Sequence, residues 1–429
     1  MKKGTITLKC FDMLLIFVLM AFIDVHLWGE DDEAKLALAS AKAVEELEAY
    51  LKIELAERGD IGEQGFAEVA LTREDAVEAR RLLWEDHVRQ IKISRAEEMK
   101  ARKLVSGDLQ MPFFYAVNGE KPKNGRSLYI SMHGGGGAPK QVNDQQWENQ
   151  KRLYEVKEGV YVAPRAPTDT WNLWHQAHID EMFDRLIEDL IVFEDVDPDR
   201  VYILGYSAGG DGVYQLAPRM ADRLAAAAMM AGHPNEASPL GLRNIAFTIH
   251  VGGDDASYNR NKVAGEWGEK LDALRKDDPE GYEHWTKIYQ GKGHWLDRQD
   301  AEALPWMAKH TRDPFPKRIV WRQDDVTHTR FYWLAIKPEE QRVGVEVRAD
   351  LKGQEFTLQT GAIGQLMIRL NDQMLNLDEG VAVNANGKEV FRGRVSRSIA
   401  VLAKTLAERG DPASVFSAEI VVKLTDKEE

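Results

Sequence analysis

The sequence is almost without cysteine, since Cys10 is the only one among 429 residues. Beyond residue 10, the chain can form no disulfide, no thiolate metal site and no cysteine nucleophile. A chain of this length can bury a large core without such covalent support. Hydrophobic residues make up 44% and charged residues 29%. This composition is that of a folded globular protein, and the length predicts two or three domains.

An excess of basic residues is also missing. The chain carries 56 lysine and arginine residues against 70 aspartate and glutamate residues, a formal charge of -14. Proteins that bind by neutralising phosphates need a basic surface. We therefore expect neither nucleic acid nor an anionic membrane surface as a partner.

Long apolar runs are absent too. The longest unbroken run covers residues 13–23 and has 11 residues, which is too short for a stable membrane span. Lysines at positions 2, 3 and 9 precede it, as in a secretory signal, although no clear cleavage motif follows. Residues 1–30 thus predict a leader and a secreted or periplasmic protein. The alternatives are a misplaced start codon and a buried N-terminal segment.

Residues 31–104 predict charged helices without a catalytic pattern. Alanine and leucine recur at helical spacing over 34–55. A second helix is expected over 73–104, with Thr72 as its N-cap and Asp75 three residues later. This segment is expected to be a solvated helical preface or a cover for another surface.

Residues 105–316 predict an α/β catalytic domain. Apolar, strand-like stretches alternate with helical ones, which favours a mostly parallel sheet with helices on both faces. The expected strands are 112–117, 127–132, 159–163, 200–204, 246–251 and 286–289, and the expected helices are 180–193, 210–220 and 262–275.

Residues 317–429 predict a small β-rich domain, because short strands separated by turns dominate this region. The expected strands are 318–322, 330–336, 343–349, 355–359, 365–370, 381–385, 390–394 and 419–424, with one helix over 397–409.

The motif Gly205-Tyr206-Ser207-Ala208-Gly209 directly follows the strand over 200–204 and leads into a helix. This is the context of a G-x-S-x-G nucleophile elbow, a sharp turn that exposes the serine at the end of a sheet. Glycines are needed because neighbouring chain passes too close for a Cβ atom. Ser207 is therefore the candidate nucleophile.

A glycine run, His133 to Gly137, ends the strand over 127–132. Backbone N–H groups in such a loop can turn inward and stabilise an oxygen that becomes negative during acyl transfer. We expect the amide of Ala208 to join them. Gly135 and Gly136 are the favoured partners, with the register left open and a flexible tight turn as the alternative.

Two further loops supply an acid and a base in the order Ser, Asp, His. Asp254 and Asp255 follow the strand over 246–251, and the spacing from Gly252 favours Asp255 without excluding Asp254. His294 stands between Gly293 and Trp295, just after the strand over 286–289. An aspartate there would orient the histidine, which would take the serine proton.

These motifs, HGGGG at 133–137, GYSAGG at 205–210, GGDDASY at 252–258 and GKGHW at 291–295, resemble the α/β-hydrolase superfamily. More narrowly, they resemble its predicted esterase and peptidase branch, which includes polyhydroxybutyrate depolymerase-like and feruloyl esterase-like proteins. It covers residues 111–316. The resemblance implies an α/β-hydrolase fold, a Ser207–His294–Asp255 triad and no cofactor.

Aromatic and histidine side chains near these motifs are candidate substrate contacts. They are His133, Tyr206, Trp171, Trp174, Trp295 and His233. The tryptophans could form a wall for an aryl or sugar group, or they could simply pack in the core. His175 and His178 have a spacing that permits zinc, but no third ligand is evident, so no metal is expected.

The sequence thus predicts a serine hydrolase of carboxylic esters, on small-molecule or polymer-linked substrates such as polysaccharide esters. The alternatives are a serine peptidase on the same scaffold and a non-catalytic binding protein that works through its β-rich module.

Overall fold

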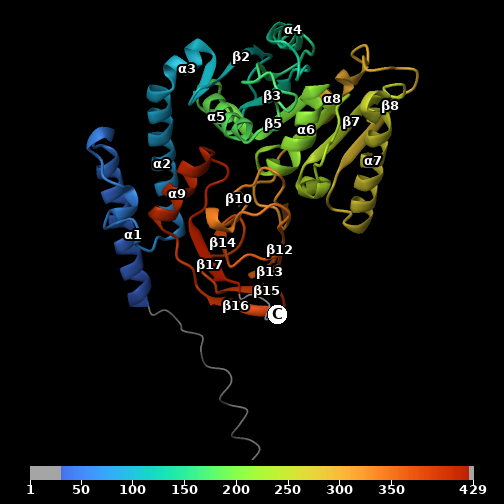
Figure 1. The fold of residues 1–429 in the computed structure, drawn as a ribbon. Helices are drawn as coiled ribbons and strands as arrows, with labels where there is room; N and C mark the ends of the chain where they lie inside the picture. The colour runs from blue at the N-terminus through green and yellow to red at the C-terminus, as the bar shows by residue number, and fades with distance from the viewer. Residues whose placement is uncertain (1–29, 425–429) are drawn as a thin grey trace, which may run out of the picture.

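The structure is a computed structural model that describes residues 30–424 (Figure 1). The predicted leader, with Cys10 and the apolar run over 13–23, lies outside the described residues, except for residue 30. Among the helices of the described part, none is long and apolar enough to cross a membrane.

The N-terminal segment forms the helices α1 (Glu30–Leu51), α2 (Arg73–Ser94) and α3 (Ala96–Ala101). Thr72 caps α2, because its side chain accepts a hydrogen bond from the N–H of Asp75 at 3.1 Å. The second helix was predicted to continue to residue 104. It is instead interrupted at Arg95 and ends where Arg102 adopts a left-handed conformation (φ 51°).

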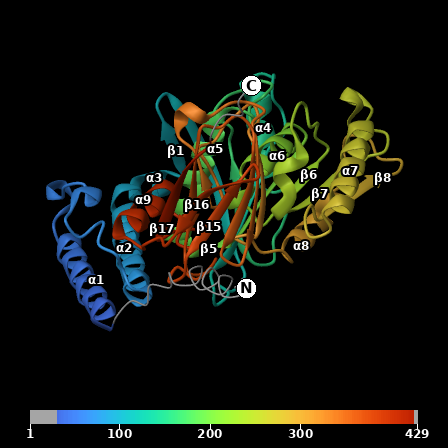
Figure 2. The ribbon, with the colours of Figure 1, turned by 90° about the horizontal axis from the view of Figure 1, so that it is seen from below.

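The N-terminal helices share a core with α9 (Ile399–Arg409), a helix from the far end of the chain. Leu47, Leu83 and Leu402 are buried in this cluster. Figure 2 shows α2 beside α9, with α1 outside them. The N-terminal helices therefore pack on the C-terminal region.

An eight-stranded sheet forms the centre of the α/β region, with the order β1-β2-β4-β3-β5-β6-β7-β8. The strands from β4 through β3 to β8 are parallel, and β1 and β2 extend the sheet in antiparallel fashion. The bounds are β1 (Lys103–Ser106), β2 (Leu109–Asn118), β3 (Arg126–Met132), β4 (Gly159–Pro164), β5 (Val196–Tyr206), β6 (Ala226–Met230), β7 (Ala246–Gly252) and β8 (His284–Tyr289).

Helices cover both faces of this sheet. Ile203 of β5 faces a cluster with α5, α6 and α7, whereas Leu204 faces a cluster with α4 and α8. The bounds are α4 (Lys140–Gln150), α5 (Ala177–Glu194), α6 (Ala208–Arg219), α7 (Arg260–Asp277) and α8 (Ala303–Met307). The predicted α/β-hydrolase fold is confirmed.

The C-terminal region is rich in strands, as predicted, and these form two further sheets. One has the order β10-β11-β14-β17 and the other β16-β15-β13-β12-β9. Trp333 and Phe356 meet between them, with ring centroids 5.2 Å apart. The bounds are β9 (Arg318–Arg322), β10 (Arg330–Phe331), β11 (Leu334–Ala335), β12 (Glu346–Lys352), β13 (Glu355–Thr360), β14 (Gln365–Leu370), β15 (Val381–Ala385), β16 (Lys388–Gly393) and β17 (Ala418–Lys423).

The C-terminal sheets pack beneath the central sheet (Figure 1), at the edge where its strands begin. Buried Arg312 donates to Asp199, near the start of β5, at 2.9 Å and to Asp411 at 2.7 Å. Tyr332 donates its N–H to Asp222, just before β6, at 3.1 Å. Residues that follow the strands' other ends are therefore left uncovered by this module.

Candidate active site

Ser207 lies at the sharp turn between β5 and α6. Its backbone has a positive φ (φ 58°, ψ −120°), an unusual and strained conformation for a residue with a side chain. A Cβ on Gly205 would stand 2.1 Å from the carbonyl oxygen of Gly209, and one on Gly209 would stand 2.2 Å from that of Met132. The close approach explains both glycines of the motif and the exposed position of the hydroxyl.

His294 joins the serine to an aspartate. Its Nε2 lies 3.0 Å from Ser207 Oγ, and its Nδ1 lies 2.7 Å from Asp255 Oδ2. An imidazole protonated on Nδ1 donates to the carboxylate and accepts from the hydroxyl. The three side chains that the sequence placed in separate loops thus meet at one edge of the sheet.

Asp254 and Asp255 have opposite environments. Asp255 is 3% exposed and faces His294. Asp254 is exposed, and its N–H donates to the carbonyl oxygen of Lys292 at 2.8 Å. The structure therefore brings Asp255, and not Asp254, to the histidine.

Gly252 is a residue whose role the sequence interpretation did not identify. A Cβ at this position would stand 2.0 Å from the carbonyl oxygen of Gly293. The missing side chain lets the histidine loop lie directly against the end of β7. Its position at the end of a strand, just before the candidate acid, was the available signal.

Tyr206 was predicted to contact substrate, and this is wrong. Its side chain is buried, and its hydroxyl donates to the carbonyl oxygen of His294 at 2.6 Å. The same hydroxyl accepts the N–H of Leu296 at 3.0 Å. Burial raises the pKa of Tyr206, so the hydroxyl keeps its proton. Through these two hydrogen bonds, Tyr206 fixes the backbone of the histidine loop.

The amide of Gly136 is not free for an oxyanion, which corrects another prediction. It donates to Asn143 Oδ1 at 2.8 Å, and the amide of Gly137 donates to Asp169 at 3.0 Å. Within residues 30–424, the amides of Gly134 and Gly135 have no hydrogen-bond partner. These two are the candidates that remain in the glycine loop.

Gly134 and Ala208 both lie next to the serine. Gly134 is so near that a Cβ on it would stand 3.2 Å from Ser207 Cβ. Ala208 begins α6, and the first amides of a helix have no partner within that helix. Gly135 adopts φ 109°, which a side chain would oppose. The loop conformation therefore depends on glycine.

His133 was also predicted to contact substrate, and it does not. The ring is fully buried, and its Nε2 accepts the N–H of Ala166 at 3.1 Å. Trp174, also fully buried, donates its indole N–H to the carbonyl oxygen of His133 at 2.9 Å. Burial lowers the pKa of His133 to about 4, so the ring is neutral near pH 7. Both side chains support the glycine loop from the core.

Trp171 and Trp295 remain as exposed aromatic candidates, at 63% and 49% exposure. Trp295 contacts Tyr206, with ring centroids 5.6 Å apart. Tyr258, on the loop after Asp255, is 77% exposed and was not predicted. Trp295 follows His294 directly, Tyr258 lies three residues after Asp255, and Trp171 lies in the segment between β4 and α5, against Gly136 and Gly137.

His233 follows β6 and lies near the same edge. Its N–H donates to Asp211 Oδ1 at 2.6 Å, and its ring Nδ1 accepts the N–H of Asn235 at 2.9 Å. The end of β6 adjoins the serine, because Ser207 donates its N–H to Met230 at 2.9 Å. His233 thus stays a candidate at the border of the site.

The described part of the chain holds no group of three or more potential metal ligands. His175 is buried against Trp171, with ring centroids 5.5 Å apart. Burial lowers the pKa of both His175 and His178. The two rings therefore have the environment of neutral, packed histidines.

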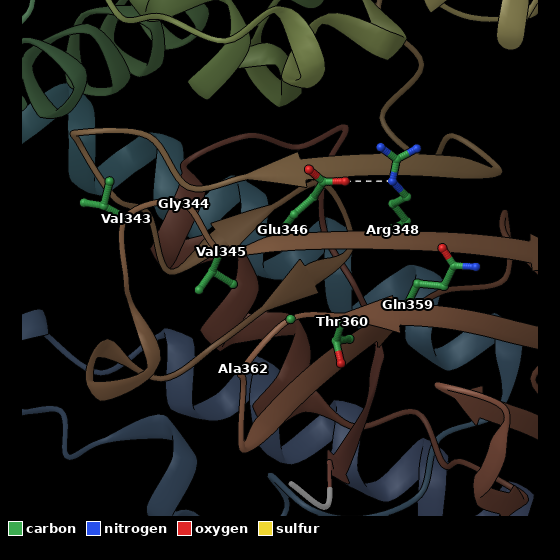
Figure 3. A pocket seen from close by; sticks show the side chains of 9 residues that line it. Val343, Gly344, Val345, Glu346, Arg348, Gln359, Thr360 and Ala362 are labelled. Carbon is green, nitrogen blue, oxygen red and sulfur yellow. Dashed lines mark hydrogen bonds and ion pairs between the residues drawn. The ribbon is translucent and has the colours of Figure 1, made fainter. Parts of the chain in front are cut away.

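A hollow of about 520 Å³ lies in the C-terminal sheets (Figure 3). Arg348 donates to its neighbour on β12, Glu346, at 2.7 Å, and no aromatic ring lines the hollow. It borders β12 and β13 rather than the loops around Ser207. The hollow offers no ring on which a sugar or aryl group could stack. Its lining residues are Val343, Gly344, Val345, Glu346, Arg348, Gln359, Thr360, Gly361 and Ala362.

Comparison with known proteins adds an independent observation. Residues 156–313 match the model of the Dienelactone hydrolase family. This match contains Ser207, Asp255 and His294, and it confirms the resemblance to the α/β-hydrolase superfamily. It supports a hydrolase that acts on esters. A search of curated proteins finds no match.

Among solved structures, a thermostable esterase is 17% identical, with a TM-score of 0.36; the match covers 49% of this chain and 62% of that one, less than two thirds of its length. Esterase PE8 is 20% identical over 46% of this chain and 97% of that chain, with a TM-score of 0.31. A carboxylesterase from Mesorhizobium loti is 17% identical, and the match covers 48% of this chain and 99% of that chain, with a TM-score of 0.33.

Proposed function

We propose that the protein is a serine esterase that cleaves carboxylic esters through an acyl-enzyme intermediate. One observation carries the proposal: His294 lies within hydrogen-bond distance of both Ser207 Oγ (3.0 Å) and the buried Asp255 carboxylate (2.7 Å). A serine, a histidine and an orienting carboxylate in this geometry generate a nucleophile near neutral pH.

The proposed reaction begins when Ser207 Oγ attacks the ester carbonyl and His294 Nε2 takes the hydroxyl proton. The carbonyl oxygen becomes negative and accepts hydrogen bonds from the amides of Ala208 and of Gly134 or Gly135. Asp255 stabilises the imidazolium that forms. His294 then gives its proton to the leaving alkoxide, and the alcohol departs.

Deacylation follows the same path with water as the nucleophile. His294 takes a proton from water as its oxygen attacks the acyl carbonyl. The tetrahedral intermediate collapses, the proton returns to Ser207 Oγ, and a carboxylic acid is released. The water-derived oxygen stays in the acid, so atoms and charge balance over the cycle.

For the substrate, we propose a polymer-linked ester, such as an acylated polysaccharide, that lies across the exposed rings. Trp171, Trp295 and Tyr258 are large, exposed aromatic side chains; Trp295 adjoins His294, and Tyr258 follows Asp255 by three residues. Aromatic rings offer flat apolar surface for sugar or aryl groups. The exposed position favours a ligand that is itself extended.

The test compares Ser207→Ala with Ser94→Ala, a control at an exposed serine on α2. With p-nitrophenyl butyrate, Ser207→Ala is expected to lose about 10⁴-fold or more in kcat, and the control none. Unchanged turnover in Ser207→Ala would reject the proposal. Faster cleavage of a matched p-nitroanilide would favour the peptidase alternative instead.

A further inference from the structure

We propose that Arg260 is a positioning residue for the reaction: its cation holds the second oxygen of Asp255 and sets the pH at which the site becomes active. This inference rests on the proposed function. Arg260 begins α7, five residues after Asp255. Its Nη1 lies 3.7 Å from Asp255 Oδ1, while His294 engages Oδ2.

The segment between the two residues folds back on itself to place this cation. Tyr258 and Asn259 are both left-handed, with φ 56° at each, a conformation that costs roughly 1 kcal/mol or more for a residue with a side chain. The guanidinium lies 4.8 Å from the centre of the Tyr258 ring and donates to the carbonyl oxygen of Ser257 at 3.5 Å. A backbone strained at two successive residues persists only where surrounding contacts hold it, and here these contacts include those of the Arg260 guanidinium.

The pairing of Arg260 is incomplete. Its side chain is 12% exposed, and its Nε is buried without a hydrogen-bond partner among the described residues. A buried cation that lacks partners is costly unless nearby anions compensate for it. Asp255 supplies one such anion from the aspartate loop.

Asp211 supplies the second from the first turn of α6, the helix that begins at Ser207. Its Oδ1 accepts the N–H of His233 at 2.6 Å. Burial raises the pKa of Asp211 to about 6, and the charge of Arg260 counteracts this rise. Arg260 is thus influenced by carboxylates from both the acid loop and the nucleophile helix.

The charge of Arg260 acts on the imidazole through Asp255. A cation near the pair disfavours a second positive charge close by, and the acid limb of the rate profile measures this effect. Asp211 has the opposite sign and the opposite effect. The ionisable and charged groups around the pair are Ser207, Tyr206, Asp211, His233, Asp254, Tyr258, Arg260 and the ion pair of Lys292 with Asp297.

The test measures the pH dependence of kcat/KM with neutral p-nitrophenyl butyrate. Arg260→Met is expected to move the midpoint of the acid limb up by about one pH unit and to lower kcat about tenfold. Arg260→Lys retains the charge and is expected to restore the midpoint. Asp211→Asn, an independent variant, is expected to move the midpoint down.

The outcomes separate this proposal from the function itself. A wild-type protein without Ser207-dependent turnover would refute the proposed function. An active wild type whose midpoint is the same in all three variants would overturn the role of Arg260 alone. So would a rise in KM confined to a carboxylate-bearing ester, because Arg260 would then be a substrate contact.

Discussion

At the scale of single residues, adjacent side chains differ sharply in their chemistry. Asp255 is buried against His294, whereas Asp254 points into solvent on the same turn. Asp255 and Asp254 carry the same charge, but only Asp255 is buried and bonded to His294, so only Asp255 can orient the imidazole. The two positions form a matched pair for experiment.

Asp255→Asn is expected to lower kcat by about 10³–10⁴-fold, because an amide cannot stabilise the imidazolium and favours the wrong tautomer. Asp254→Asn is expected to leave kcat within about twofold. Steady-state kinetics with a p-nitrophenyl ester checks both. Equal losses in the two variants would contradict the assignment of the acid.

His250 gives a prediction about stability and pH. It is fully buried in β7, its ring bonded to Thr248 at 2.9 Å and to Tyr289 at 2.8 Å. Burial lowers its pKa from 6.5 to about 3. The unfolded chain therefore binds this proton first, and the stability that neutral His250 contributes is complete above pH 6.5 and declines toward pH 3.

The measurement compares denaturant unfolding of the wild type and His250→Gln across this range. The difference in unfolding free energy is expected to shrink by about 1.4 kcal/mol for each pH unit below 6.5. Because both proteins carry the same other ionisable groups, those groups cancel. A constant difference from pH 7 to pH 4.5 would show that His250 does not titrate this way.

The motifs predicted which residues come together, but not how each one is turned. Ser207, Asp255 and His294 converge as their order along the chain implies. His133 and Tyr206 belong to the same motifs, yet both side chains point into the core. Motif membership fixes position along the chain, while orientation depends on contacts such as that of Tyr206 with Leu296, 90 residues away.

At the scale of elements, the most regular strands and helices were predictable, whereas atypical elements such as β6 and α4 were not. β6 reads Ala-Ala-Ala-Met-Met, residues that favour helix over strand, but it is buried between β5 and β7. α4 carries mostly polar residues and lacks an apolar stripe. Tertiary packing, which a local pattern does not contain, decides both.

The contact between the end of β7 and the histidine loop yields an element-scale prediction. Gly252→Ala is expected to lower kcat at least tenfold, because its Cβ would meet the carbonyl oxygen of Gly293 at 2.0 Å and displace the loop. Gly293→Ala is the matched control, since nothing lies within 4 Å of its Cβ position. Kinetics and a melting curve for each variant check this, and a harmless Gly252→Ala would refute it.

At the scale of the whole molecule, the C-terminal sheets and the candidate active site lie at opposite edges of the central sheet. The contacts of this module run through buried charges, with Asp411 accepting from Arg312 at 2.7 Å and from Arg223 at 3.2 Å. Both arginines hold the pKa of Asp411 down at about 2. We therefore expect the module to stabilise the fold and not to cover Ser207.

Asp411→Asn is expected to destabilise the protein by about 3–5 kcal/mol, because it leaves buried arginines without their anion. Asp350→Asn is the control: its pair with Arg318 is exposed and worth about 1 kcal/mol or less. Chemical denaturation measures both. The turnover of folded Asp411→Asn should equal that of the wild type, and a selective loss of activity would place the module in the reaction.

The most direct test of the whole account is intact-protein and peptide mass spectrometry after a brief reaction with a slowly hydrolysed p-nitrophenyl ester. The account predicts one added acyl group, located on Ser207 and absent from Ser207→Ala. Its release should slow markedly in Asp255→Asn. An acyl group on another residue, or hydrolysis with no acylated protein at any time, would contradict a Ser207 acyl-enzyme.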